Sequence, residues 1–401
     1  MAVTFTQQPT TPNGSQSTII YGVSNLATQP QAKYVCDIVD KDTSNLLVRI
    51  KQPANENNFG VFEITDVLHD YLDYDEVWTI TSPVTSSNYN VREFSIQFGE
   101  EYGTSISSSV TVYPNQISQD IVVYPAVTDP MDGFNWDTSS YQDASLSSHP
   151  VGMYMKSTDY GTMSRMNIST NYVDSISIVV FDADSNPLAI KTIPNPYPYT
   201  TYTNSESKLV HFPIGPKNFE NDGVLNILSD PTAWNNYLIV TTPETDTQIV
   251  INSDTLGQPC TDENGTRFAF INRQGVWDYW RASLTRTESE TYETDTYEQS
   301  FVDFSTTNGQ IPFNKSRRGT TIYNKKITSN YSAQTDWLDQ QNADYLVELF
   351  ESPSVYVQYG DGFIPVIITN TQVDKKTTPR GQKLFTYRIN YTLANPRKSR
   401  R

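Results

Sequence analysis

A chain of 401 residues is long enough for two or three domains, each with its own buried core. The 28 Lys and Arg residues against 45 Asp and Glu residues give a net charge of −17, which excludes nucleic acid and anionic membranes as general partners. Tyr contributes 26 residues, and Ser, Thr and Asn recur throughout. Because these types suit half-buried strands and turns, we predict an all-β protein of mainly antiparallel β-sandwich domains with one or two short helices.

Residues 1–14 have the composition of a polar N-terminal arm and lack the basic and apolar regions of a signal peptide. The sequence contains no run of about 18 apolar residues that would cross a membrane. We therefore expect synthesis in the cytoplasm, no membrane partner, and no exit by the secretory route.

The segment 15–125 predicts a first β-sandwich domain, because short alternating runs such as "STIIYGV", "AKYVCDIVD" and "SVTVYPN" are separated by turn residues. "GVFEITDVLHDYL" interrupts these runs with apolar residues at helical spacing, namely Ile64, Val67, Leu68 and Leu72. We expect a short helix here with Thr65 as its N-cap.

The segment 126–255 predicts a second β-rich domain, entered through a Pro- and Asp-rich excursion over about 124–150. "DADSN" (Asp182 to Asn186) resembles the start of a calcium loop but lacks the required Gly and terminal Glu. A turn between two strands is the favoured interpretation.

A C-terminal β domain is predicted over 256–401, and it begins with the aromatic stretch "FAFINRQGVWDYW". This stretch has two interpretations, an aromatic ligand platform or a strand-turn-strand unit. Phe268 and Phe270 alternate on one strand face, 272–275 has turn composition, and Trp277 and Trp280 begin the next element. We predict the structural unit, with Phe268, Phe270, Gly275, Trp277 and Trp280 as an anchor for the next segment of the chain.

A long hairpin is predicted over about 280–330, because "ASLTRTESETYETDTYEQSFVDFSTT" has strand composition without an apolar face. With a turn at Asn308-Gly309, its acidic residues come back roughly opposite the basic residues of the returning strand. These interface candidates are Glu288, Glu290, Glu293, Asp295 and Glu298 on the first strand, and Arg317, Arg318, Lys325 and Lys326 on the second.

An amphipathic helix is predicted over about 335–351, with the final strands after it. Thr335 is its expected N-cap and Pro353 ends it. Leu338, Asn342, Leu346, Leu349 and Phe350 form one stripe of this helix. Asp361-Gly362 predicts a hairpin turn between two of the final strands.

The sequence offers no recognisable chemistry, and we expect no catalytic residue, metal site or cofactor. His69, His149 and His211 lack metal-ligand spacing and are expected on the surface or in loops. Hydrolase and nucleotide-binding motifs do not occur. Cys36 and Cys260 are predicted to be ordinary buried thiols, with a long-range disulfide left open.

The C-terminal "NPRKSRR" places four basic residues on an acidic protein. A solvated tail is one interpretation. The other is an arm that docks onto an acidic neighbour, such as the acidic strand of an adjacent copy. The interface candidates here are Arg397, Lys398, Arg400 and Arg401.

Several segments together resemble a family of structural proteins of tailed phages that infect Bacteroidetes, including crAss-like phages and marine relatives. These segments are "FAFINRQGVWDYWRASLTRT", "RRGTTIYNKKI", "TDWL", "YLVELFESPSVYV" and "FIPVIITN…KLFTYRINYTLAN", with "GVFEITDVLHDYL" nearer the N-terminus. The resemblance covers about half of the chain and does not extend to 126–255.

The resemblance implies a non-enzymatic virion component, most plausibly of the tail, such as a ring, collar, hub or baseplate-proximal protein. Such a protein is made in the bacterial cytoplasm, assembles with itself as a homo-oligomeric ring, and contacts other virion proteins. The alternative is a receptor- or carbohydrate-binding virion protein that binds host glycan through exposed aromatics such as Trp136 and Tyr141. A polysaccharide-degrading enzyme is a third class, and it requires two carboxylates that converge in a cleft.

Overall fold

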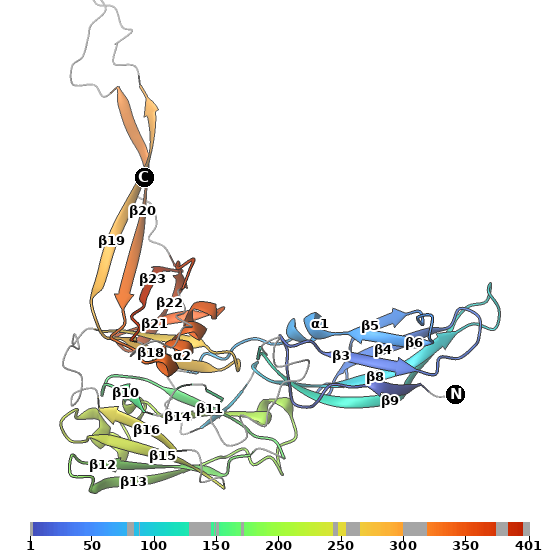
Figure 1. Ribbon diagram of the computed structural model, residues 1–401, viewed down its shortest axis with the longest axis horizontal. Helices are drawn as coiled ribbons and strands as arrows, with labels where there is room; N and C mark the ends of the chain where they lie inside the picture. The colour runs from blue at the N-terminus through green and yellow to red at the C-terminus, as the bar shows by residue number, and fades with distance from the viewer. Residues whose placement is uncertain are drawn as a thin grey trace, which may run out of the picture. The chain divides into compact units, whose positions relative to one another are not determined.

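The computed structural model describes the chain except where placement is uncertain. The described residues are 3–77, 84–87, 89–127, 146–147, 149, 152–169, 172–243, 248–253, 265–299, 319–373 and 384–395. The protein is all-β and mainly antiparallel, as predicted, with two α-helices in the described part (Figure 1). Neither helix is long and apolar enough to cross a membrane.

The first β-sandwich consists of a three-stranded sheet (β1-β3-β6) and a five-stranded sheet (β2-β9-β8-β4-β5). Side chains from the inner faces of both sheets form one core that includes Tyr21, Phe62, Phe98 and Ile121. Cys36 is a free, buried thiol in this core, and Cys260 lies outside the described residues. The strands are β1 (Thr4–Gln7), β2 (Asn13–Gly14), β3 (Ile20–Ser24), β4 (Lys33–Asp40), β5 (Leu46–Gln52), β6 (Phe59–Glu63), β8 (Arg92–Tyr102) and β9 (Thr111–Tyr124).

The N-terminal segment predicted as a polar arm instead contributes to both sheets. β1 pairs with β3 and β2 pairs with β9. Val3 and Asn13 are buried. The polar composition of the segment fits β1, a short strand at a sheet edge whose side chains are mostly exposed.

The predicted first helix forms as α1 (Thr65–His69), with Leu68 buried and Val67 packed against the core of the first sandwich. The prediction that Thr65 is its N-cap is wrong, because Ile64 occupies that position without a side-chain hydrogen bond. The Thr65 hydroxyl instead accepts a hydrogen bond from the backbone N–H of Ile19 at 2.9 Å, which ties the helix to the start of β3.

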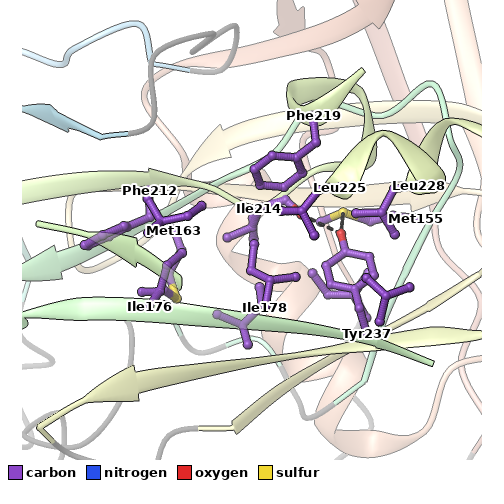
Figure 2. Packing of buried hydrophobic residues seen from close by; sticks show 14 of the residues in the cluster. Met155, Met163, Ile176, Ile178, Phe212, Ile214, Phe219, Leu225, Leu228 and Tyr237 are labelled. Carbon is purple, nitrogen blue, oxygen red and sulfur yellow. Dashed lines mark hydrogen bonds between the residues drawn. The ribbon is translucent and has the colours of Figure 1, made fainter. Parts of the chain in front are cut away.

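The second β-sandwich packs a five-stranded sheet (β10-β16-β15-β12-β13) on a three-stranded sheet (β11-β14-β7). Figure 2 shows its core, where the Tyr237 hydroxyl lies among aliphatic and Met side chains and donates to the carbonyl of Ile214. The strands are β7 (Thr85–Ser86), β10 (Met153–Met155), β11 (Thr162–Met166), β12 (Ser175–Phe181), β13 (Pro187–Pro194), β14 (Leu209–Pro213), β15 (Asn236–Thr242) and β16 (Gln248–Ser253), with 3-10 turns at Ser205–Lys208, Pro216–Phe219 and Leu225–Ser229.

"DADSN" forms the turn between β12 and β13, as predicted in preference to a calcium loop. The carboxylate of Asp182 accepts hydrogen bonds from the backbone N–H groups of Asp184 and Asn186 at 2.9 and 2.8 Å. These hydrogen bonds, led by those from Asn186, lower the pKa of Asp182. The Asp182 carboxylate therefore stabilises the turn itself.

The two sandwiches belong to one compact unit, 1–258 with 271–279, although the sequence suggested separate domains divided near 125. β7 comes from the first predicted domain but pairs with β14 of the second. A small shared core joins the two sandwiches and includes Val91, Tyr124, Met166 and Leu209. The apolar runs on either side of 125 are similar, so the sequence pattern does not reveal that they share a core.

The second unit, 259–270 with 280–401, contains a seven-stranded sheet in the order β18-β17-β21-β22-β23-β20-β19. The helix α2 (Gln340–Glu351) packs Leu346 and Leu349 into its core. β21 and β22 are joined at the predicted Asp361-Gly362 turn. The strands are β17 (Thr266–Ile271), β18 (Trp277–Ala282), β19 (Arg286–Glu298), β20 (Thr320–Gln334), β21 (Val355–Tyr359), β22 (Gly362–Ile368) and β23 (Arg388–Leu393).

α2 begins five residues later than predicted, and its N-cap is Asp339 in place of Thr335. The Asp339 carboxylate accepts a hydrogen bond from the backbone N–H of Asn342 at 2.8 Å. Thr335 is fully buried, and its hydroxyl accepts a hydrogen bond from the backbone N–H of Tyr387 at 2.9 Å. Pairing of the chain before α2 with a distant segment therefore delays the start of the helix.

Gly275 offers a test of how tightly the turn between β17 and β18 is built. Its φ is +76°, and a Cβ there would lie 2.6 Å from the carbonyl oxygen of Pro125. We expect Gly275→Ala to lower the unfolding free energy of the first unit by about 2–4 kcal/mol, measured by urea unfolding. Gly152→Ala is the control in the same unit, because its φ is +98° and its Cβ would make only an ordinary contact, 3.6 Å from Asn252 Nδ2. A loss no larger than the control's would contradict the packing argument.

Candidate assembly interface

The long hairpin predicted over about 280–330 exists as the pair β19 and β20, which extends beyond the rest of its sheet (Figure 1). The two strands pair antiparallel from Arg286 with Ala333 to Glu298 with Thr320, with one irregularity next to Asp295. The predicted turn at Asn308-Gly309 lies outside the described residues. We call the paired segment 286–298 with 320–334 the arm.

The root of the arm is built into the core of the second unit. Ala333 is fully buried, and the ring of Tyr331 stacks on Tyr391 of β23 at 5.3 Å. The guanidinium of Arg286 lies over the same Tyr331 ring at 5.5 Å from its centroid. β23 pairs with β20 only over Asn330 to Gln334. The arm is therefore fixed at one end, where the strand ladder of the sheet continues into it.

The outer part of the arm is exposed on both faces. All 13 residues of β19 are exposed, and β19 pairs with β20 alone among the described strands. Large apolar and aromatic side chains lie on this exposed ribbon, with Tyr292 53%, Ile322 55% and Tyr323 58% exposed. A two-stranded ribbon in water is marginally stable by itself. The arm thus resembles a surface that becomes covered when a partner binds.

Fewer acidic residues of the arm lie opposite a basic residue than the sequence suggested. Glu293 lies opposite Lys326, and their side chains form an ion pair at 3.2 Å. Both side chains are about two-thirds exposed, so this pair contributes about 0.2–1 kcal/mol at most. The ammonium of Lys325 lies 4.6 Å above the ring of Tyr292.

The other acidic candidates on β19 face neutral residues across the ladder. Tyr331 lies opposite Glu288, Ser329 opposite Glu290, Asn324 opposite Asp295 and Thr320 opposite Glu298. The two lysines are adjacent in sequence, so their side chains alternate between faces and only one directly opposes an acid. Six basic candidates and the two aromatics of the glycan-binding alternative lie outside the described residues, namely Arg317, Arg318, Arg397, Lys398, Arg400, Arg401, Trp136 and Tyr141.

The aromatic stretch before the arm forms the predicted strand-turn-strand unit. Phe268 and Phe270 are fully buried in the core of the second unit. The tip, 271–279, belongs to the first unit. Trp277 is 2% exposed, and its indole N–H donates to the backbone carbonyl of Asp75. Buried rings present no flat face to a ligand, so the platform interpretation is wrong for these residues.

The turn at this tip is held by a buried polar network within the first unit. The carboxamide of Asn272 donates to the carbonyl of Leu146 at 2.7 Å and to the carboxylate of Asp278 at 2.9 Å. The Asn90 side chain donates to the carbonyl of Gly275 at 3.0 Å. Trp280, in the second unit, lies 5.9 Å from Tyr345 of α2. These contacts show how the anchor residues named from the sequence are held in place. That these residues anchor the arm stays a prediction.

His211 was predicted on the surface or in a loop, but it is fully buried on β14. Its Nδ1 lies 2.8 Å from the Ser164 hydroxyl, and its Nε2 lies 3.9 Å from Asp75 Oδ2. Burial lowers the pKa of His211 to about 4, and the nearby Asp75 carboxylate partly offsets this. A Ser, a His and an Asp thus lie together, but full burial gives a substrate no access. In "KLVHFPI" His211 stands in an almost continuous apolar run, which is typical of a strand buried on both faces and was the signal for a buried histidine.

No family model matches this sequence, and no curated protein matches it. Among solved structures, the fibronectin(III)-like modules of CbhA from Clostridium thermocellum match with a TM-score of 0.16 and 7% sequence identity. That match covers 65% of this chain and 100% of the other. A score this low carries no information on fold or function.

Proposed function

We propose that this protein is a non-enzymatic structural component of a bacteriophage tail that assembles as a homo-oligomeric ring and contacts other virion proteins. The observation that carries the proposal is the arm, a strand pair fixed at its root and exposed on both faces and along the whole of β19. The assignment to a phage tail comes from the sequence resemblance.

The size of the arm indicates how a neighbour would bind it. Thirteen residues of β19 at about 3.3 Å each extend about 43 Å, and two strands are about 10 Å wide, so each face offers about 430 Å². A standard interface buries about 800 Å² on each partner. Both faces of the arm together reach that area, whereas one face alone gives about half. We therefore expect the arm to lie between neighbours, covered on both faces.

The exposed edge of the arm favours a specific partner over non-specific strand addition. Five carboxylates along β19, at Glu288, Glu290, Glu293, Asp295 and Glu298, disfavour pairing with a second β19 edge because like charges would meet. A subunit contact through β19 is therefore heterologous, in which one surface meets a different surface of the next copy. Heterologous contacts close into rings when the rotation between copies permits.

Two measurements test the proposed function. Mass spectrometry of purified phage particles is expected to detect the protein at a copy number that fits a ring. Sedimentation of the isolated protein over a concentration series is expected to show self-association. A compact monomer at high concentration that is also absent from particles would contradict the proposal.

The basic C-terminal segment gives a further prediction under this proposal. Deletion of 395–401 should weaken assembly more at low than at moderate salt, because screening already reduces the attraction between exposed charges at moderate salt. Sedimentation of the deletion variant and the full chain at two salt concentrations measures this. Equal assembly of the two proteins at both concentrations would remove the tail from the assembly mechanism.

A further inference from the structure

A groove of about 520 Å³ lies in the second unit, far along the sequence from Trp136 and Tyr141. A backbone bridge builds it by pairing Leu338, just before α2, with Phe385, just before β23. This bridge brings Trp337 and Arg388 to the same groove although about 50 positions separate them in sequence. The volume is within the range of about 300–1,000 Å³ that small-molecule sites occupy.

The apolar part of the groove combines buried rings with one exposed indole. Phe385 and Tyr387 are 3% and 9% exposed, and the Tyr387 ring meets Phe350 edge to face at 6.0 Å. Trp337 is 64% exposed, the largest exposed aromatic side chain of the described lining. A rigid indole beside a fixed apolar base provides a flat face on which a ring can stack.

Hydrogen bonds within the protein fix part of the polar lining of the groove and leave other donors without a partner among the described residues. The Asn370 carboxamide donates to the carbonyl of Arg388 at 2.8 Å and accepts from the backbone N–H of Asn390 at 2.6 Å. The Nε of Arg388 donates to the Ser332 hydroxyl at 2.7 Å, which orients the guanidinium. The terminal nitrogens of Arg388 have no hydrogen-bond partner among the described residues.

The charge of the groove is unusual for this protein. The chain carries a net charge of −17, yet no described lining residue is acidic and Arg388 has no ion-pair partner in the described part of the chain. An arginine held by its Nε presents its remaining N–H groups in the planar arrangement that matches a carboxylate. The described lining of the groove therefore pairs a stacking face with a cation that no described carboxylate neutralises.

We propose that this groove binds an acidic sugar, a uronic acid unit of a polysaccharide. The pyranose ring stacks on Trp337, the carboxylate pairs with the terminal nitrogens of Arg388, and the Asn390 carboxamide lies within the groove to meet hydroxyl groups. A neutral sugar would offer Arg388 only uncharged hydroxyl acceptors, and a peptide carboxylate without an aromatic ring would leave the face of Trp337 unused. Ser332 at the root of the arm orients Arg388, but the site uses none of the outer arm and does not depend on self-assembly.

Isothermal titration of the full chain with a galacturonic acid tetramer tests the proposal, with a neutral galactose tetramer and a peptide with a free C-terminal carboxylate as comparisons. We expect the acidic tetramer to bind at least about tenfold more tightly than either comparison, since one lost charge-assisted contact is worth about 1.5–3 kcal/mol. Trp337→Ala and Arg388→Gln should each weaken this binding at least about tenfold. Trp337→Tyr should retain most of it.

The matched control is Tyr359→Ala, which removes an exposed ring, 68% exposed, from the β21–β22 turn of the same unit. It should leave binding unchanged. Failure of the acidic tetramer to bind, equal binding of the neutral tetramer, tighter binding of the peptide, or full binding by Trp337→Ala would each overturn the proposal. If a groove variant fails to fold, indole fluorescence of the unmodified protein is measured during the titration instead. A sugar ring stacked on Trp337 must change the emission of this indole, so unchanged emission would overturn the proposal.

Discussion

Replacement of residues 291–328 by an Asn-Gly turn is expected to weaken self-association strongly while leaving both units folded. Glu290 and Ser329 oppose each other, so a two-residue turn can join β19 to β20 at this point without changing the register. The buried core of the second unit uses residues outside the deletion, such as Ala333 and Tyr391. We expect sedimentation to show the dissociation constant for assembly rising at least about 100-fold, with urea unfolding nearly unchanged.

A milder variant tests whether assembly depends on the exposed side chains of the arm or only on the presence of its strands. Serine at Tyr292, Ile322 and Tyr323 removes three exposed apolar side chains but keeps the ribbon. Tyrosines are frequent interface hot spots, and the loss of one hot spot costs about 2 kcal/mol or more, so assembly should weaken by at least about tenfold. Ile106→Ser is the control, because Ile106 is 87% exposed and lies away from the arm in sequence, in the connection between β8 and β9. Assembly that survives both arm variants would contradict the role of the arm.

The second large effect is a loss of stability in acid caused by His211. Burial lowers its folded-state pKa to about 4, whereas the unfolded chain has the ordinary value of 6.5. Between these values the unfolded state binds the proton and the folded state does not, so stability rises with pH across this window. The full contribution is present above about 6.5. Below about pH 4 the cumulative loss is about 3 kcal/mol.

Urea unfolding of the first unit at pH 4, 5, 6 and 7 measures this dependence. Asp75 and Ser164 are the polar groups beside the imidazole, and the Asp75 carboxylate opposes the loss by favouring the charged ring. His211→Gln should be less stable than the natural protein at pH 7 and should have a slope smaller by about one proton between pH 4 and 6.5. An unchanged slope in this variant would show that other groups cause the acid sensitivity.

Much of the fold can be predicted from the sequence because strands and turns leave local signals. The alternation in "AKYVCDIVD" and the Asp-rich turn at 182–186 depend on neighbours a few residues away, and both were predicted. Thr335 and His211 differ, because distant segments decide their roles. Pairing with Tyr387 makes Thr335 a buried hydrogen-bond acceptor, and the second sandwich encloses His211. A local sequence pattern carries no information about these long-range contacts.

The same contrast between local signals and distant contacts applies to the arm and to the groove. The arm was predictable because a long Thr-, Tyr- and Glu-rich strand without an apolar face has no core of its own to join. The register that pairs Glu293 with Lys326 and leaves Asp295 beside Asn324 was not predictable, since one irregularity shifts every later pair. The groove was missed because the Leu338–Phe385 bridge that assembles it joins two segments with no shared motif.

Photo-crosslinking from the arm within assembled particles tests the central claim most directly. A photoreactive phenylalanine in place of Tyr292, which is 53% exposed, places the probe on the outer part of the ribbon. We expect crosslinks that join two copies of this chain, visible as dimers and identified by mass spectrometry of the linked peptides. The same probe at position 106 should give none. Crosslinks confined to a single chain, or none from position 292 in assembled particles, would contradict the account.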